Sequence, residues 1–69
     1  MRKLYTIKYS NDLYQKDETS FTWELNEAII SSNIEWLNAV AERALMYPDL
    51  YRCVAGCSYN LVEVKIVEV

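Results

Sequence analysis

The segment SNIEWLNAVAERAL, residues 32–45, decides the fold, because its apolar residues recur at the three- and four-residue spacing of a helix. Ser32 and Glu35 have the spacing of a capping box, so the helix is predicted to begin there. Pro48 bounds the helix, since its ring disfavours helical conformation at the residue before it. One apolar stripe results, made of Ile34, Leu37, Val40, Ala41, Ala44 and Leu45.

Two strands are predicted before this helix. Residues Lys3 to Tyr9 and Thr19 to Leu25 alternate between apolar and polar side chains, which is typical of half-buried strands. The polar stretch from Ser10 to Glu18 between them is predicted to be a hairpin loop, so the two strands are expected to pair antiparallel. Asn26 to Ser31 fits either an extra helical turn or an extension of the second strand.

Two more strands are predicted after the helix. Leu50 to Ala55 is a short apolar run, Gly56 to Asn60 supplies turn residues, and Leu61 to Val69 alternates again. In this last strand one face is expected to carry Val62, Val64 and Ile66. The predicted fold class is therefore α+β, a four-stranded antiparallel sheet (β-β-α-β-β) with one helix packed on one face, in a single compact domain over residues 1–69.

One helix covers only one face of such a sheet. The other face is expected to expose Leu4, Leu61, Val67 and Val69. Contiguous apolar area there would be a partner surface or a dimer interface. Scattered surface residues are the ordinary alternative.

The composition is that of a folded domain, since 52% of the 69 residues are hydrophobic and there is one glycine and one proline. No signal peptide or bilayer-length apolar run is present, so no membrane association is expected. Cys53 and Cys57 are interpreted as reduced thiols, because a lone disulfide is sparse for a small secreted scaffold. These features favour the cytoplasm.

The sequence lacks the residues of common catalytic and cofactor sites. Without histidine, the usual Ser-His and Cys-His nucleophiles are excluded, and a zinc site is disfavoured. A single glycine allows no glycine-rich phosphate loop. The chain is therefore predicted not to be an enzyme and to need no cofactor or metal. Direct nucleic-acid binding is not expected either, because its seven basic residues are spread out.

Charge is unevenly distributed along the chain. From Asp17 to Glu42 there are six acidic residues and no basic one, whereas the whole chain has a net charge of −3. An acidic surface with an aromatic anchor steers basic partners and can form a binding hot spot. The predicted partner-binding residues are Trp23, Glu24, Glu27, Glu35, Trp36 and Glu42.

In size, charge and pattern the chain resembles the small anti-defence proteins of phages and other mobile elements, of which anti-CRISPR proteins are an example. The resemblance implies an inhibitor that occupies the surface of a basic, nucleic-acid-binding host protein, in the host cytoplasm. A second hypothesis is a homo-oligomeric structural or accessory protein, a homodimer for example, that pairs through its C-terminal strand or its open sheet face.

Overall fold

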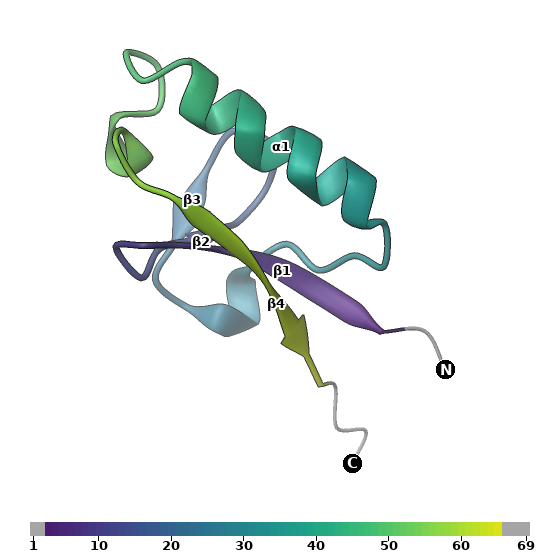
Figure 1. The fold of residues 1–69 in the computed structure, drawn as a ribbon. Coiled ribbons are helices and arrows are strands. Elements are labelled where there is room, and N and C mark those ends of the chain that lie inside the picture. Colours follow the sequence, from purple (N-terminus) through teal and green to yellow (C-terminus); the bar gives the residue numbers. More distant parts are fainter. Residues whose placement is uncertain (1–2, 66–69) are drawn as a thin grey trace.

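The computed structural model describes residues 3–65, and in it one α-helix lies across one face of an antiparallel sheet (Figure 1). The α+β class and the four-stranded sheet are confirmed. Along the sheet the strand order is β3-β2-β1-β4. The elements are β1 (Leu4–Tyr9), β2 (Tyr14–Gln15), β3 (Phe21–Thr22), the 3-10 helix η1 (Leu25–Glu27), α1 (Ile34–Met46), the 3-10 helix η2 (Arg52–Val54) and β4 (Tyr59–Val64).

β1 is the central strand. On one side it pairs with β4 in a continuous register that runs from Leu4 opposite Val64 to Tyr9 opposite Tyr59. On the other side it pairs with β2 and with Ser31, whose amide and carbonyl both bond to Tyr5. The doubtful segment 26–31 therefore contains part of a 3-10 turn and a bridge to the sheet.

Among residues 3–65, three strands precede the helix and one follows it, so the elements run β-β-β-α-β where β-β-α-β-β was predicted, while the four-stranded sheet is as predicted. β2 lies inside the segment predicted to be a loop, because a tight turn follows β1. In that turn Asp12 adopts a positive φ of 72° and the Tyr9 amide donates to the Leu13 carbonyl at 2.8 Å. The short side chain of aspartate tolerates this left-handed conformation better than most residues do.

The predicted strand over residues 19–25 is cut short at Thr22. Its hydroxyl accepts a hydrogen bond from the Glu24 amide at 3.1 Å and donates one to the Glu27 carboxylate at 3.0 Å. Local side-chain bonds of this kind offer the backbone an alternative to the strand ladder. The chain consequently turns at Trp23 and enters η1.

Helix α1 begins one residue later than a Ser32 cap would place it. The N-cap is Asn33, whose side-chain oxygen accepts from the Trp36 amide at 3.1 Å. The apolar stripe is otherwise confirmed, because the helix buries Leu37, Val40, Ala41 and Ala44, while Ile34 in the first turn stays 44% exposed.

The segment from Leu50 to Ala55 is not a strand, and that prediction is wrong. The Tyr47 carbonyl accepts from the amides of both Leu50 and Tyr51, which folds the chain into a turn that leads into η2. The segment still serves the core, since Val54 is fully buried. Gly56 then takes a φ of +78°, a left-handed conformation that favours glycine.

The two faces of β4 are the reverse of the prediction. Leu61 lies opposite Ile7 and packs against the core beneath α1, whereas Val62 lies opposite Thr6, on the face away from α1. Val64 shares that outer face with Leu4, its partner in β1. Pairing with β1 fixes this register. Ile66, Val67 and Val69, which the predictions also placed on faces, lie outside the described residues.

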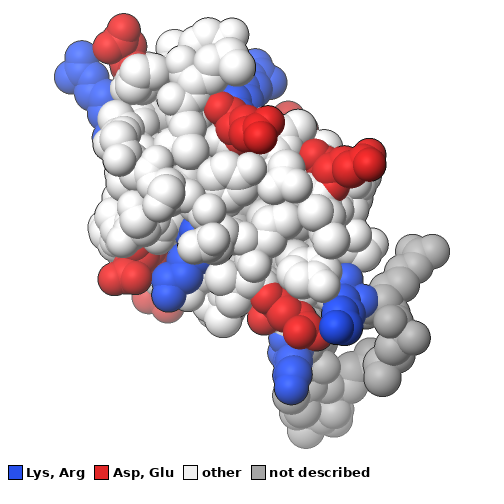
Figure 2. Space-filling model, in the orientation of Figure 1, with Lys and Arg blue, Asp and Glu red and all other residues white. Residues whose placement is uncertain are grey.

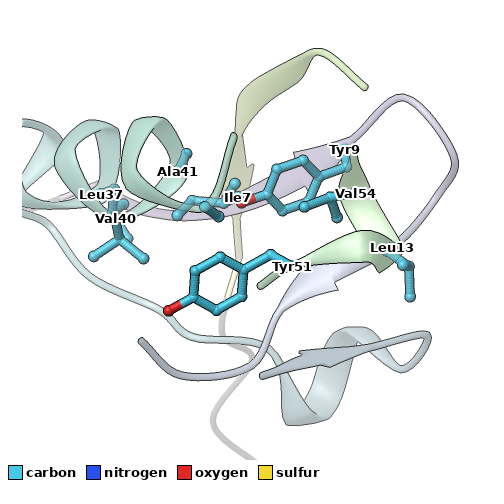
Figure 3. Close-up of a cluster of buried hydrophobic side chains, with 9 residues drawn as sticks. Ile7, Tyr9, Leu13, Leu37, Val40, Ala41, Tyr51 and Val54 are labelled. Carbon is cyan, nitrogen blue, oxygen red and sulfur yellow. The ribbon is translucent and has the colours of Figure 1, made fainter. Parts of the chain in front are cut away.

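The core lies between α1 and the sheet, and Figure 3 shows the helix side chains gathered over Ile7 and Tyr9. Two aromatic pairs extend it towards β3 and η2, with the ring centroids of Tyr9 and Phe21 5.7 Å apart and those of Phe21 and Tyr51 6.0 Å apart. The buried Tyr9 hydroxyl donates to Gln15 Oε1 at 2.6 Å. Within residues 3–65, no helix is long and apolar enough to cross a membrane.

Candidate functional site

The acidic residues of α1 form a ridge on its solvent side. Glu35 and Glu42 are both exposed and two helical turns apart, about 10 Å along the axis. Figure 2 shows the carboxylates of this view as separate groups divided by uncharged atoms, with basic groups among them at the margins. The ridge is thus a line of two isolated charges and not a dense acidic patch.

The other acidic residues of the predicted site lie across the sheet. Thr22 is opposite Tyr14 in the sheet and points away from α1, and its hydroxyl holds the Glu27 carboxylate on that side. Glu24 is the N-cap residue of η1, and its amide donates to the same hydroxyl. Figure 1 shows η1 on the opposite side of the strands from α1. The structure therefore splits the predicted acidic face into two groups.

The two tryptophans also separate. Trp36 is half-buried on α1 and packs against the core, so its ring already contributes to the packing of the protein. Trp23 is 66% exposed in the turn between β3 and η1. Leu25, two residues further on, is 45% exposed. We call Trp23, Glu24, Leu25 and Glu27 the η1 surface.

In the described part of the chain, no basic side chain forms an ion pair with these carboxylates. The one ion pair in that part joins Lys8 Nζ to Asp12 Oδ1 at 3.7 Å, outside the acidic window from Asp17 to Glu42. Lys16, Arg43 and Lys65 pair with no described carboxylate. Arg43 and Glu18 do line one shallow hollow of about 110 Å³ beside α1. Both predicted acidic groups keep their charge available to a partner.

The remaining reactive side chains are two cysteines and two tyrosines with raised pKa values. Cys53 is exposed, Cys57 is half-buried, and both are free thiols. Burial is the main cause that raises the pKa of the Tyr9 hydroxyl far above its ordinary value, with smaller contributions from Tyr59 and Cys57. Burial and then the charge of Glu42 raise the pKa of Tyr59, whose hydroxyl donates to Asn38. Among residues 3–65, no three potential metal ligands lie together.

One exposed apolar cluster was not predicted from the sequence. Met46 at the end of α1 and Tyr47 and Leu50 just after it have exposed fractions of 68%, 51% and 73%. Apolar residues around Pro48 were the available signal. The C-terminal strand was already considered as a pairing surface from the sequence, and the strand order now places β4 at an edge of the sheet that residues 3–65 form.

Comparison with known proteins gives no relative for this chain: no family model, curated protein or solved structure matches it.

Proposed function

We propose that this chain is a small protein-binding module that uses the η1 surface to dock on a basic partner protein. Catalysis is not part of the proposal. The partner class is a basic, nucleic-acid-binding protein of the host, and the proposed outcome is inhibition in the cytoplasm by occupation of its nucleic-acid site. This is the mode of the phage anti-defence proteins that the chain resembles in size, charge and pattern.

One observation carries the proposal: Trp23 is 66% exposed and is followed directly by the exposed carboxylate of Glu24. Exposing a tryptophan to water gives up about 2 kcal/mol or more of burial free energy, which a partner pocket would recover. Tryptophan is also among the residues most enriched in binding hot spots. An apolar anchor beside negative charge is complementary to a pocket rimmed by lysine or arginine.

The two acidic groups make different contributions in this proposal. Glu24 and Glu27 flank the anchor and would meet the partner directly. Glu35 and Glu42 lie on the other side of the sheet, so they add to the long-range field that steers association and is screened within about 8 to 10 Å at physiological salt. Trp36 supports the core beneath them.

The test compares three variants in affinity capture from host extract. Trp23→Ala and Glu24→Lys are expected to lose a captured basic protein at least about tenfold, because each removes an anchor or reverses a contacting charge. Glu42→Lys is the matched control, since it makes the same charge change on the α1 side. Glu27 is left unchanged because it bonds to Thr22.

A competition step tests the inhibitory part of the proposal. A short oligonucleotide that the captured protein binds should displace this chain if both occupy one site. Retention of the complex at saturating oligonucleotide would reject inhibition by occupation and leave binding intact. Loss of capture with Glu42→Lys and not with Glu24→Lys would move the interface to α1 and refute the η1 surface.

A further inference from the structure

The two edges of the sheet are very different. β3 forms one edge and has only two residues, after which the chain turns away. β4 forms the other edge and has six residues, all in unbroken register with β1. Natural edge strands are commonly blunted by shortness, proline, lysine or a bulge. β4 has none of these within its bounds, and its one charged residue is Glu63.

The hydrogen bonds of β1 reveal which backbone groups face outward on β4. Tyr5 and Tyr9 direct their backbone groups away from β4, to Ser31 and Leu13. The alternate residues of β1, including Thr6, therefore bond to β4, as the bond from the Ser10 amide to the Ser58 carbonyl also indicates. Each outward residue of β4 lies opposite Tyr5, Ile7 or Tyr9, the residues of β1 that do not bond to β4. The outward amides and carbonyls belong to Tyr59, Leu61 and Glu63.

These three residues form a self-complementary edge. When two copies of β4 run antiparallel about a two-fold axis at Leu61, Leu61 meets Leu61 and Tyr59 meets Glu63 of the second copy. All the outward groups are then used in about six backbone hydrogen bonds. No carboxylate lies directly opposite another. A two-fold axis at Glu63 would oppose two carboxylates, a pairing that destabilises a sheet.

We propose that the β4 edge docks the β4 edge of a second copy of this chain, joining the two sheets into one antiparallel sheet across a two-fold axis. The axis is perpendicular to the sheet, so both α1 helices lie on the same face. The pairing is an isologous interface, in which the same surface serves both copies. It does not use the η1 surface, so the dimer and the basic-partner proposal stand or fall separately.

The test is the concentration dependence of mass by sedimentation in the full chain, from about 1 µM to about 500 µM. Wild type is expected to change from monomer to dimer. Glu63→Pro removes an outward amide and leaves the β1 ladder intact, because Glu63 and Tyr5 do not exchange hydrogen bonds; it is expected to raise the dimer dissociation constant at least about tenfold. Glu63→Ala keeps the amide and is the matched control.

Hydrogen exchange supplies a readout that needs no variant. The amides of Tyr59, Leu61 and Glu63 should gain protection as the protein is concentrated, whereas the amide of Val62, bonded to β1, should be protected throughout. A wild-type chain that stays monomeric at the highest concentration would overturn the proposal. So would a dimer that Glu63→Pro leaves unchanged while the outward amides exchange freely.

Discussion

Thr6 and Thr22 show how two buried threonines can differ in their effect on stability. Both point to the sheet face away from α1, and their exposed fractions are 0% and 8%. The Thr22 hydroxyl has two partners, Glu24 and Glu27. The Thr6 hydroxyl has no hydrogen-bond partner among the described residues. A buried polar group without a partner keeps the whole cost of its lost hydration.

Thr6→Val is therefore expected to stabilise the protein by about 1 kcal/mol, because valine has nearly the same shape and suits a strand. Urea unfolding at equilibrium measures the change. Thr22→Val is the matched control and should destabilise by about 1 to 3 kcal/mol, since it leaves the Glu24 amide and the Glu27 carboxylate without this partner. Equal losses from both substitutions would contradict the difference in hydrogen bonding.

At the scale of elements, the start of α1 has two neighbouring candidates for the N-cap, Ser32 from the sequence and Asn33 from the structure. Asn33→Ala is expected to lower the free energy of unfolding by about 1 kcal/mol, because Asn33 accepts the Trp36 amide. Ser32→Ala should change it by less than about 0.5 kcal/mol, as usual for an exposed surface site. Thermal unfolding followed by circular dichroism compares the two variants. A larger loss of unfolding free energy from Ser32→Ala would show that Ser32 caps the helix, as the capping box predicted.

Long elements with a clear period were predictable from the sequence, and short ones were not. β1 and α1 repeat their apolar residues over 6 and 13 residues, enough for the period to be recognised. β2 and β3 have two residues each, too few to show any period. The phase of β4 was wrong because Leu61, Val62 and Val64 place apolar residues on both faces, and only pairing with β1 decides between them.

The candidate site was predictable in content and not in arrangement. The acidic window was predictable because the positions of the charged residues can be read directly from the sequence. Its division into two groups depends on the path of the chain after β3. A three-residue 3-10 helix and the hydroxyl of Thr22 determine that path. Such local bonds have no periodic signature. The exposure of Trp23 similarly follows from the early end of β3 at Thr22.

For the whole molecule, net charge gives the two proposed interactions opposite responses to salt. Each copy carries −3, and Glu42 lies beside Tyr59, where the dimer would also bring Glu63 of the second copy. Added salt screens this repulsion, so the dimer should strengthen as NaCl rises from about 0.1 M to about 1 M and the Debye length falls from about 10 Å to about 3 Å. Binding of a basic partner should weaken over the same range.

Sedimentation and affinity capture across one salt series measure both responses on the same protein. Glu63→Ala and Glu24→Lys serve as controls, since the first should reduce the salt response of the dimer alone and the second that of partner capture. A dimer that dissociates with added salt would require opposite charges at its interface, which the outward side of β4 does not supply. Partner capture that strengthens with salt would mean that the Trp23 contact dominates and that the carboxylates of the η1 surface contribute no attraction.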